Sequence, residues 1–287
     1  MVSIIIPTYN RANTLVRCIK SLLNQTYSDF EIIIVDDRST DNSEAIIKNI
    51  CDSRIKYIKH EKNLGANAAR NTGIKYAVGE FIAFQDSDDE WVNNKLEIQL
   101  RELKNSNADI VASSFIRYMG KRKTLLPKEK IEDNCAAIRL LRKNYISTQT
   151  VLGKAECFKN NEFDKDLPRF QDWELMIRLT RKYKIHFINR PLANVYVQDD
   201  SITKKPLKAV EALKIIMNKH KELFDNDHVA KAGFYNLLGD IYLSMNYFKH
   251  CYYIKSLKYN KLNYKTYIRI CIYIYKKYKP KTKIVSN

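Results

Sequence analysis

The sequence predicts an α/β protein whose doubly wound, mostly parallel sheet is followed by a helical extension. Runs rich in Ile and Val, at 2–8 and 31–35, show no alternation of apolar and polar residues, which indicates strands covered on both faces. Strand-like and helix-like segments alternate four times in about the first ninety residues, as they do in doubly wound domains. The last eighty residues or so are basic and rich in Tyr.

The elements of the first half follow from their residue patterns. A helix is expected from 13 to 24 because Leu15, Ile19 and Leu22 recur at helical spacing. Ser39 or Asp41 can cap the next helix, which is expected to run to about residue 51. The remaining elements are strands at 54–59 and 80–84 and helices at 67–77 and 91–103.

The second half is less regular. A helix at 133–143 is expected to turn Ile138, Leu140 and Leu141 inward, and another is expected to begin near Asp172 and end near residue 184. Strands are expected at 109–118, 148–153, 185–188 and 193–197, with a basic turn at 120–123.

Composition is that of a soluble globular protein. The 287 residues are 45% hydrophobic and 29% charged, and no apolar run approaches the roughly 20 residues that span a bilayer. Six Cys are scattered without the C-x2-C spacing of a zinc site, and the first strand begins close to Met1. We therefore expect reduced thiols, no targeting segment and a cytoplasmic location.

Positive charge is concentrated at the C-terminal end. The chain carries a formal net charge of +18, to which residues 206–287 contribute +11 and residues 1–205 contribute +7. No acidic residue follows Asp240. This asymmetry predicts an anionic partner for the last part of the chain, such as a membrane surface, a nucleic acid or another polyanion.

Three carboxylates, Asp86, Asp88 and Asp89, lie between a predicted strand and the helix after it. In open α/β sheets the carboxyl ends of the strands are where ligands bind. Acids this close repel one another unless a cation lies between them, and a hard divalent ion meets that need. The alternative is a solvated turn that caps the next helix. An EF-hand loop is disfavoured because its sixth position requires Gly, and Trp91 stands there.

The turns after the first two strands predict a nucleotide site without a dinucleotide fingerprint. No G-x-G-x-x-G motif follows the first strand, where Pro7-Thr-Tyr-Asn-Arg11 stands instead. Tyr9 and Asp37 are expected at the same sheet edge as the acidic cluster. An aromatic face with a carboxylate suits a base such as uracil, and a metal suits a diphosphate. Taken singly, Tyr9 is also typical of a packing aromatic and Asp37 of a turn residue.

Five motifs occur in order at the ends of these elements. They are Ile-Ile-Ile-Pro-Thr-Tyr-Asn-Arg at 4–11, Val-Asp-Asp-Arg-Ser-Thr-Asp at 35–41, Asn-Leu-Gly at 63–65, Ala-Arg-Asn-Thr-Gly at 69–73 and Gln-Asp-Ser-Asp-Asp at 85–89. Together they resemble the inverting family 2 glycosyltransferases over roughly residues 1–205. The resemblance implies a GT-A fold, with a nucleotide-sugar-binding half at 1–107, an acceptor half at 108–205 and a helical extension at 206–287.

The resemblance also implies roles for individual residues. Contacts to the donor nucleotide are expected from Pro7, Tyr9, Asp37, Arg70 and Asp86. Of these, Tyr9 would stack on the base, Asp37 would accept from its ring N–H and Asp86 would lie near the ribose. Asp88 is expected to hold the Mn²⁺ or Mg²⁺ that bridges the diphosphate. Asp89 and Trp173 are candidates for contacts with the sugar or the acceptor, and Trp173 is equally well explained as a core residue.

Asp172 is expected to be the catalytic base. An inverting transfer needs a carboxylate to take the proton of the acceptor hydroxyl, across the sugar from the departing diphosphate. Asp172 opens a helix in the acceptor half, at the place of the family's Glu-Asp pair or its Gln-Asp-Trp variant. Gln171 precedes it here, so only one carboxylate is present. The alternative is an acid that is favoured by the helix dipole.

One loop, the two lysines after it and two histidines also bear on the site. The family's mobile loop, which often carries a His or Arg toward the phosphates, corresponds to 198–203. This loop has neither residue, and Lys204 and Lys205 are the nearest cations. His60 and His186 are expected to be surface or packing residues rather than ligands.

The extension is expected to be helical at 206–224 and within 247–278. Its mixture of Tyr, Ile and Lys suits a lipid–water interface, with Lys toward anionic head groups. A tail packed on the catalytic domain or on a sister chain explains the mixture equally well, and the latter would make a homo-oligomer.

These observations predict an inverting, metal-dependent hexosyltransferase. It would move a sugar from a nucleotide diphosphate sugar, UDP-linked by preference, to a glycan or lipid-linked oligosaccharide in capsule or other surface-polysaccharide synthesis. It would work in the cytoplasm or peripherally on the cytoplasmic face of the membrane. The alternatives are a nucleic-acid-binding protein, disfavoured because no reader motif is present, and a related nucleotidyltransferase, which would release pyrophosphate.

Overall fold

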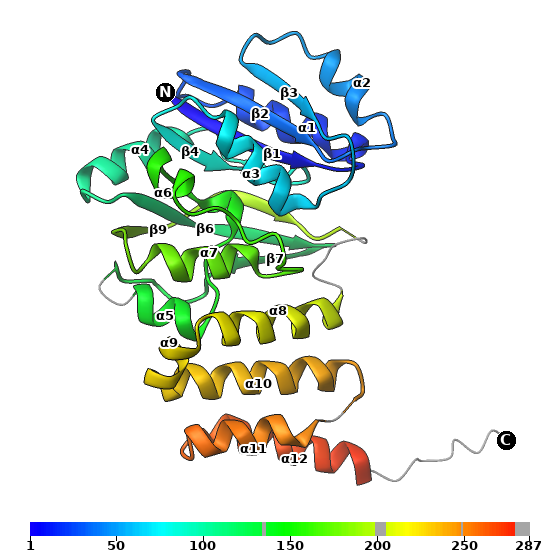
Figure 1. The fold of residues 1–287 in the computed structure, drawn as a ribbon, viewed down its shortest axis with the longest axis vertical. Helices are drawn as coiled ribbons and strands as arrows, with labels where there is room; N and C mark the ends of the chain where they lie inside the picture. The colour runs from blue at the N-terminus through cyan, green and yellow to red at the C-terminus, as the bar shows by residue number, and fades with distance from the viewer. Residues whose placement is uncertain (134–135, 199–204, 248, 279–287) are drawn as a thin grey trace, which may run out of the picture. The chain divides into compact units, whose positions relative to one another are not determined.

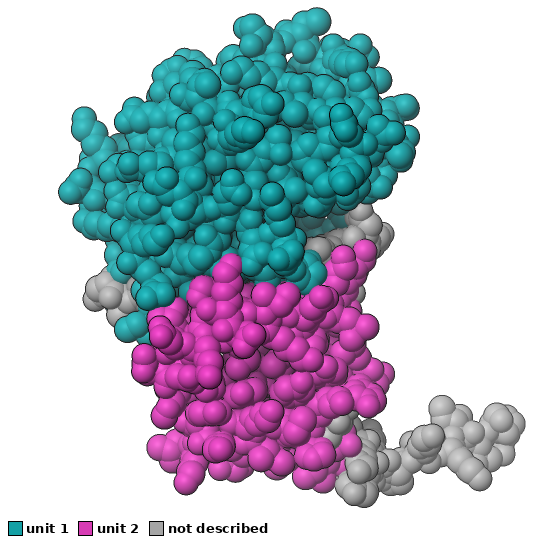
Figure 2. Space-filling model, in the orientation of Figure 1, with its two compact units in different colours: residues 1–140, 144–204 teal, residues 141–143, 205–287 magenta. Residues whose placement is uncertain are grey.

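The computed structural model describes residues 1–133, 136–198, 205–247 and 249–278 (Figure 1). The chain divides into two compact units, which are described separately. Unit 1 consists of residues 1–140 and 144–204, and unit 2 of residues 141–143 and 205–287 (Figure 2). The short segment 141–143 thus belongs to unit 2.

Unit 1 is built on one mixed sheet. In the described residues its strands follow the order β3-β2-β1-β4-β8-β6-β9-β5, and β7 pairs with β6. The first four of these strands run parallel, whereas β8 is antiparallel to β4. The bounds are β1 Val2–Thr8, β2 Phe30–Asp36, β3 Ile55–Lys59, β4 Phe81–Phe84, β5 Glu90–Trp91, β6 Ile110–Met119, β7 Arg122–Leu126, β8 Leu152–Lys154 and β9 Ile185–Tyr196. The predicted α/β class is confirmed.

Helices cover both faces of the parallel strands, and the side chains of β1 show why. Ile4 and Ile6 belong to the core cluster that contains Leu15 of helix α1. Ile5 faces the other way and meets Gly73 of α3, where an added Cβ would come within 2.4 Å of Ile5 Cγ2. The helices before residue 180 are α1 Ala12–Leu23, α2 Ser43–Lys48, α3 Ala66–Tyr76, α4 Lys95–Asn105, α5 Ala136–Arg142, α6 Ala155–Lys159 and α7 Gln171–Leu179.

Four predictions about this region were wrong. The strand expected at 148–153 is one of them, because Thr148–Thr150 forms a 3-10 helix and β8 covers only Leu152–Lys154. Trp91 does not begin a helix, because Glu90–Trp91 pairs with β9 as a short strand and α4 starts only at Lys95. The two strands expected within 185–197 form the single strand β9. Ile138 of α5 was expected to point inward but is 53% exposed.

Unit 2 is a group of helices. They are α8 Pro206–Lys219, α9 Lys221–Asn226, α10 His228–Ser244, α11 His250–Tyr259 and α12 Tyr264–Tyr278. The single helix expected at 206–224 is interrupted at His220. α12 is joined to α10 by polar contacts, since Arg269 Nε donates to Asp240 Oδ1 over 2.7 Å. Among the described residues, none of the helices has both the length and the apolar character needed to cross a membrane.

Candidate active site

The turns after β1 and β2 are bonded to each other at the carboxyl edge of the sheet. The Asp37 N–H donates to Thr8 O over 2.8 Å, and the Asn10 N–H donates to Ser39 Oγ over 2.9 Å. Asn10 has a positive φ of 51°, which Asn tolerates better than most residues. Tyr9 lies between these contacts and is 45% exposed, so its ring is open to a ligand.

Asp37 is buried and links the end of β2 to the segment before α3. Its carboxylate accepts from the Leu64 N–H over 2.8 Å and from the Gly65 N–H over 2.6 Å. His60 Nδ1 lies 2.9 Å from Asp37 Oδ1, and its Nε2 lies 2.9 Å from Thr72 Oγ1. His60 therefore has a definite packing role: it orients the carboxylate of Asp37, which is a predicted site residue. Nothing in its local sequence signalled this contact.

Arg70 joins α3 to the acidic turn after β4. Its side chain is 5% exposed and donates to Asp86 Oδ1 over 2.7 Å, while the Asp86 side chain is 29% exposed. The Arg70 guanidinium lies 5.4 Å from the centre of the Phe163 ring. A buried cation thus faces a partly open carboxylate at the edge where β1 and β2 end.

Asp88 lies on the same turn and is partly exposed. Its side chain is 21% accessible, and Arg11 Nε lies 3.8 Å from its Oδ2. The backbone of Asp88 is fixed by Arg17, which donates to its carbonyl oxygen over 2.6 Å. The Asp88 carboxylate is therefore presented by an anchored backbone.

Asp89, although adjacent, belongs to the scaffold. It is 2% exposed, and its two oxygens accept from Gln149 Nε2 over 2.7 Å and from the Tyr196 N–H over 2.8 Å. Burial first, and then repulsion from Asp88 and Asp86, raises the pKa of Asp89 well above its usual value. This geometry favours a role in holding the turn against β9 over the predicted contact with sugar or acceptor.

Two other predicted residues are also buried. Trp173 is 2% exposed and donates from its indole N–H to Leu140 O over 2.5 Å, which favours the core alternative. Pro7 lies in β1 beside Val35 of β2 and is buried, so a ligand at the edge would meet little of its side chain.

The residues present fit a divalent cation that is held partly by the protein and partly by the phosphate oxygens of a bound molecule. The described part of the chain contains no group of three or more His, Cys, Asp and Glu side chains that could hold a metal. Asp86 and Asp88 nevertheless offer partly exposed carboxylate oxygens on one turn. Mg²⁺ and similar ions are commonly bound through one or two carboxylates, with phosphate oxygens and water completing the coordination.

Asp172 lies in the first turn of α7 and is half-buried. Its Oδ1 accepts from the Trp173 N–H over 2.7 Å and from Asn144 Nδ2 over 3.3 Å. Burial raises the pKa of Asp172 to about 6, with the Arg70 charge opposing the rise and the Asp86 charge adding to it. The same two charges that meet after β4 thus act on Asp172, which brings the acidic turn and α7 into one electrostatic environment.

The loop at 198–203 falls almost entirely outside the described residues, as does Lys204; Lys205 precedes α8.

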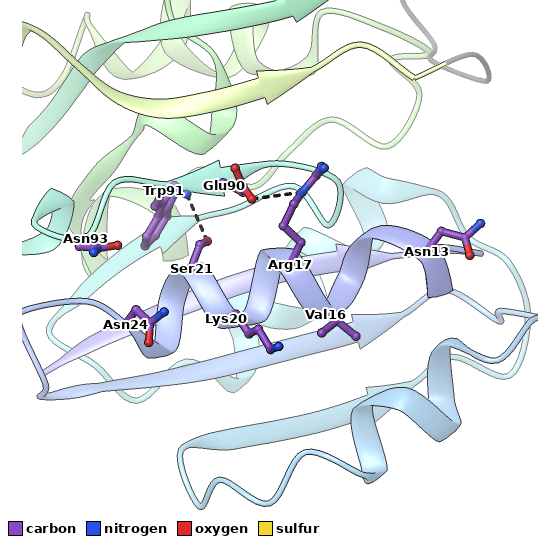
Figure 3. Close-up of a pocket in the computed structure, with 9 residues that line it drawn as sticks. All are labelled: Asn13, Val16, Arg17, Lys20, Ser21, Asn24, Glu90, Trp91 and Asn93. Carbon is purple, nitrogen blue, oxygen red and sulfur yellow. Dashed lines mark hydrogen bonds and ion pairs between the residues drawn. The ribbon is translucent and has the colours of Figure 1, made fainter. Parts of the chain in front are cut away.

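A separate groove of about 570 Å³ runs along α1 (Figure 3). It is lined by Asn13, Val16, Arg17, Lys20, Ser21, Asn24, Glu90, Trp91 and Asn93. None of the predicted donor or catalytic residues lines it.

Residues 3–163 match the sequence pattern of the protein family described as glycosyl transferase family 2. The chain belongs to this family. The glucosyltransferase WfaP of Escherichia coli, named as acting between UDP-Glc and α-D-GlcNAc-diphosphoundecaprenol, is 33% identical over 88% of this chain and 96% of its own length. An uncharacterized glycosyltransferase of Rickettsia bellii is 34% identical over 80% of this chain, which spans about a third (33%) of that longer relative.

Solved structures share the GT-A fold of the family. Staphylococcus aureus TarS in complex with UDP-GlcNAc has a TM-score of 0.66 at 20% identity, over 85% of this chain and 72% of that one. The mannosyltransferase PcManGT of Pyrobaculum calidifontis, with GDP-Man and Mn²⁺, has a TM-score of 0.64 at 15% identity, over 96% of this chain and 80% of that one. At these low identities the two structures show a shared fold and nothing more.

Proposed function

We propose that the protein transfers a sugar, with inversion, from a UDP-linked donor to a lipid-linked glycan. The observation that carries the proposal is the gathering of Tyr9, Asp37 and the Arg70–Asp86 pair at one edge of the sheet. This set pairs an open aromatic ring with buried and partly buried charges. Such a set suits a nucleotide better than a uniformly apolar ligand.

In the proposed complex Tyr9 stacks on the base and Asp37 accepts from its ring N–H. Asp37 is pre-oriented for this because Leu64 and Gly65 already donate to its oxygens. Oδ1 also faces His60, so the ring N–H of the base would donate to Oδ2, which has lone-pair capacity beyond the Gly65 N–H. Arg70 and Asp86 would lie beside the ribose and the first phosphate. Asp88 would hold Mn²⁺ or Mg²⁺, which when bound screens negative charge on the diphosphate.

Asp172 acts as the base in this proposal. Its ionised carboxylate takes the proton of an acceptor hydroxyl while that oxygen bonds to the anomeric carbon. The bond from that carbon to the diphosphate oxygen breaks on the opposite face, and the nucleoside diphosphate leaves with the electron pair. A pKa of about 6 suits this role because the group is mostly ionised at neutral pH and is still more basic than an ordinary aspartate.

The proposed donor and acceptor follow the relatives. WfaP and WfgD of E. coli are named for UDP-Glc and a diphosphoundecaprenol-linked acceptor, and we extend that class of substrate to this chain. The synthesis of a capsule or another surface polysaccharide at the cytoplasmic face of the membrane is the matching setting.

The test is a donor screen with product analysis. The protein is incubated with UDP-Glc, UDP-GlcNAc or GDP-Man, with Mn²⁺ and a short-chain diphospholipid acceptor, and the released nucleotide and the anomeric configuration of the product are measured. UDP release with an inverted product supports the proposal. Pyrophosphate release would indicate a nucleotidyltransferase, and no turnover with any donor and acceptor would contradict the proposal.

A further inference from the structure

The two sides of helix α12 in unit 2 differ sharply. One side packs on α10, where Thr266 is buried and exchanges hydrogen bonds with Asn236, and Arg269 pairs with Asp240. The other side carries an exposed apolar row, which we call the α12 stripe. It consists of Tyr264 (64% exposed), Tyr267 (49%), Ile268 (50%), Ile272 (44%) and Ile274 (48%).

This stripe has the spacing of one helix face. Relative to the first residue, its members stand at i, i+3, i+4, i+8 and i+10, which places them on a single side of an α-helix. Contiguous exposed apolar side chains rimmed by polar residues mark interaction surfaces, unlike single scattered ones. The stripe therefore calls for an apolar partner.

Lysines rim the stripe. Lys261 lies at its edge, because Tyr267 OH donates to Lys261 O over 3.1 Å, and Lys265 follows the first stripe residue directly. Both lysines are exposed. Residues 241–287 contain ten Lys and one Arg and no acidic residue, so no carboxylate in that segment offsets this charge.

A surface that is apolar in the middle and cationic at its rim matches an anionic bilayer, where hydrocarbon lies beneath phosphate. A second copy of this chain fits less well, because two-fold pairing through the stripe would bring the same lysines together. A single-stranded nucleic acid would stack on the two tyrosines but would leave the three isoleucines without a matching surface.

We propose that the α12 stripe lies on an anionic phospholipid surface, with Ile268 and Ile272 in the acyl boundary and Lys261 and Lys265 against the head groups. Sugar transfer is not required for this binding, so the proposal can fail while the proposed function stands. If both hold, the surface brings the enzyme to its lipid-linked acceptor.

The experiment is co-sedimentation of the full chain with vesicles. Binding is expected with phosphatidylcholine vesicles that contain phosphatidylglycerol, weaker binding at high salt, and little binding to phosphatidylcholine alone. Each lysine near an anionic surface contributes roughly fivefold in affinity, so K261E/K265E should weaken binding by more than about tenfold. I268S/I272S should also weaken it by about tenfold or more, since apolar burial is lost.

Matched controls separate this surface from general effects. K208E/K214E changes the net charge equally at exposed lysines of α8, and Val78→Ser removes an apolar side chain that is 65% exposed in unit 1. Both should bind vesicles as the wild type does. The proposal would be overturned by absence of vesicle binding, or by equal binding of the stripe and control variants. It would also be overturned if the stripe variants changed only the oligomeric state, measured by light scattering. So would binding of an oligonucleotide in place of vesicles.

Discussion

Asp172→Asn should stabilise the fold while it greatly slows transfer. The pKa of Asp172 is raised from an ordinary value of 3.8 to about 6, chiefly by burial. A rise of about two units corresponds to about 3 kcal/mol, which is the cost of keeping the group ionised in the folded protein. The amide is neutral and can still accept the Trp173 N–H, whose donor atom lies 2.7 Å from Oδ1. The variant therefore avoids that cost.

The two pKa values determine whether Asp172 stabilises or destabilises the fold as pH rises, and in which pH range it does so. Below pH 3.8 the carboxyl is protonated in both folded and unfolded chains, so it costs nothing. Between about pH 4 and 6 the unfolded chain loses the proton first, and the wild type loses stability as pH rises. Urea denaturation should thus show nearly equal stability of wild type and variant at about pH 3, and a variant more stable by up to about 3 kcal/mol above pH 7.

Transfer should fall by about 10²–10⁴-fold in the same variant, with UDP affinity little changed. Asp166→Asn is the control, because Asp166 is exposed and precedes the same helix; it should change neither quantity. A stability difference independent of pH would refute the assignment of the raised pKa. Turnover within about tenfold of wild type would refute the role of Asp172 as base.

Three further predictions test the rest of the scaffold and site. Asp88→Asn should remove most of the stimulation by Mn²⁺, measured as UDP release against metal concentration, while the melting temperature stays near wild type. Gly73→Ala should destabilise by about 1–3 kcal/mol in urea, because its Cβ would meet Ile5 Cγ2 at 2.4 Å. Gly233→Ala, whose Cβ would meet nothing closer than 3.8 Å, should instead stabilise by up to about 1 kcal/mol. Asp37→Asn should weaken UDP binding, measured by calorimetry, and should also destabilise the fold. Asn has one acceptor oxygen, so only one of the Leu64 and Gly65 N–H groups keeps its hydrogen bond.

The sequence by itself determined the α/β class and the order of the first elements. Residues 2–8 are buried on both faces, as their Ile-rich run without alternation predicts. Local patterns suffice here because a central strand is covered on both faces, so apolar residues are favoured on both of its sides. The motifs at the strand ends also sufficed to identify the family.

Only the tertiary structure decided what each polar residue does at the edge. Asp88 and Asp89 are adjacent and chemically identical, yet Asp88 is partly exposed while Asp89 is sealed by Gln149 and Tyr196 from distant segments. His60 orients Asp37 across 23 positions of sequence. The reason is physical: exposure and hydrogen-bond partners depend on which segments the fold brings together, and no local pattern encodes them.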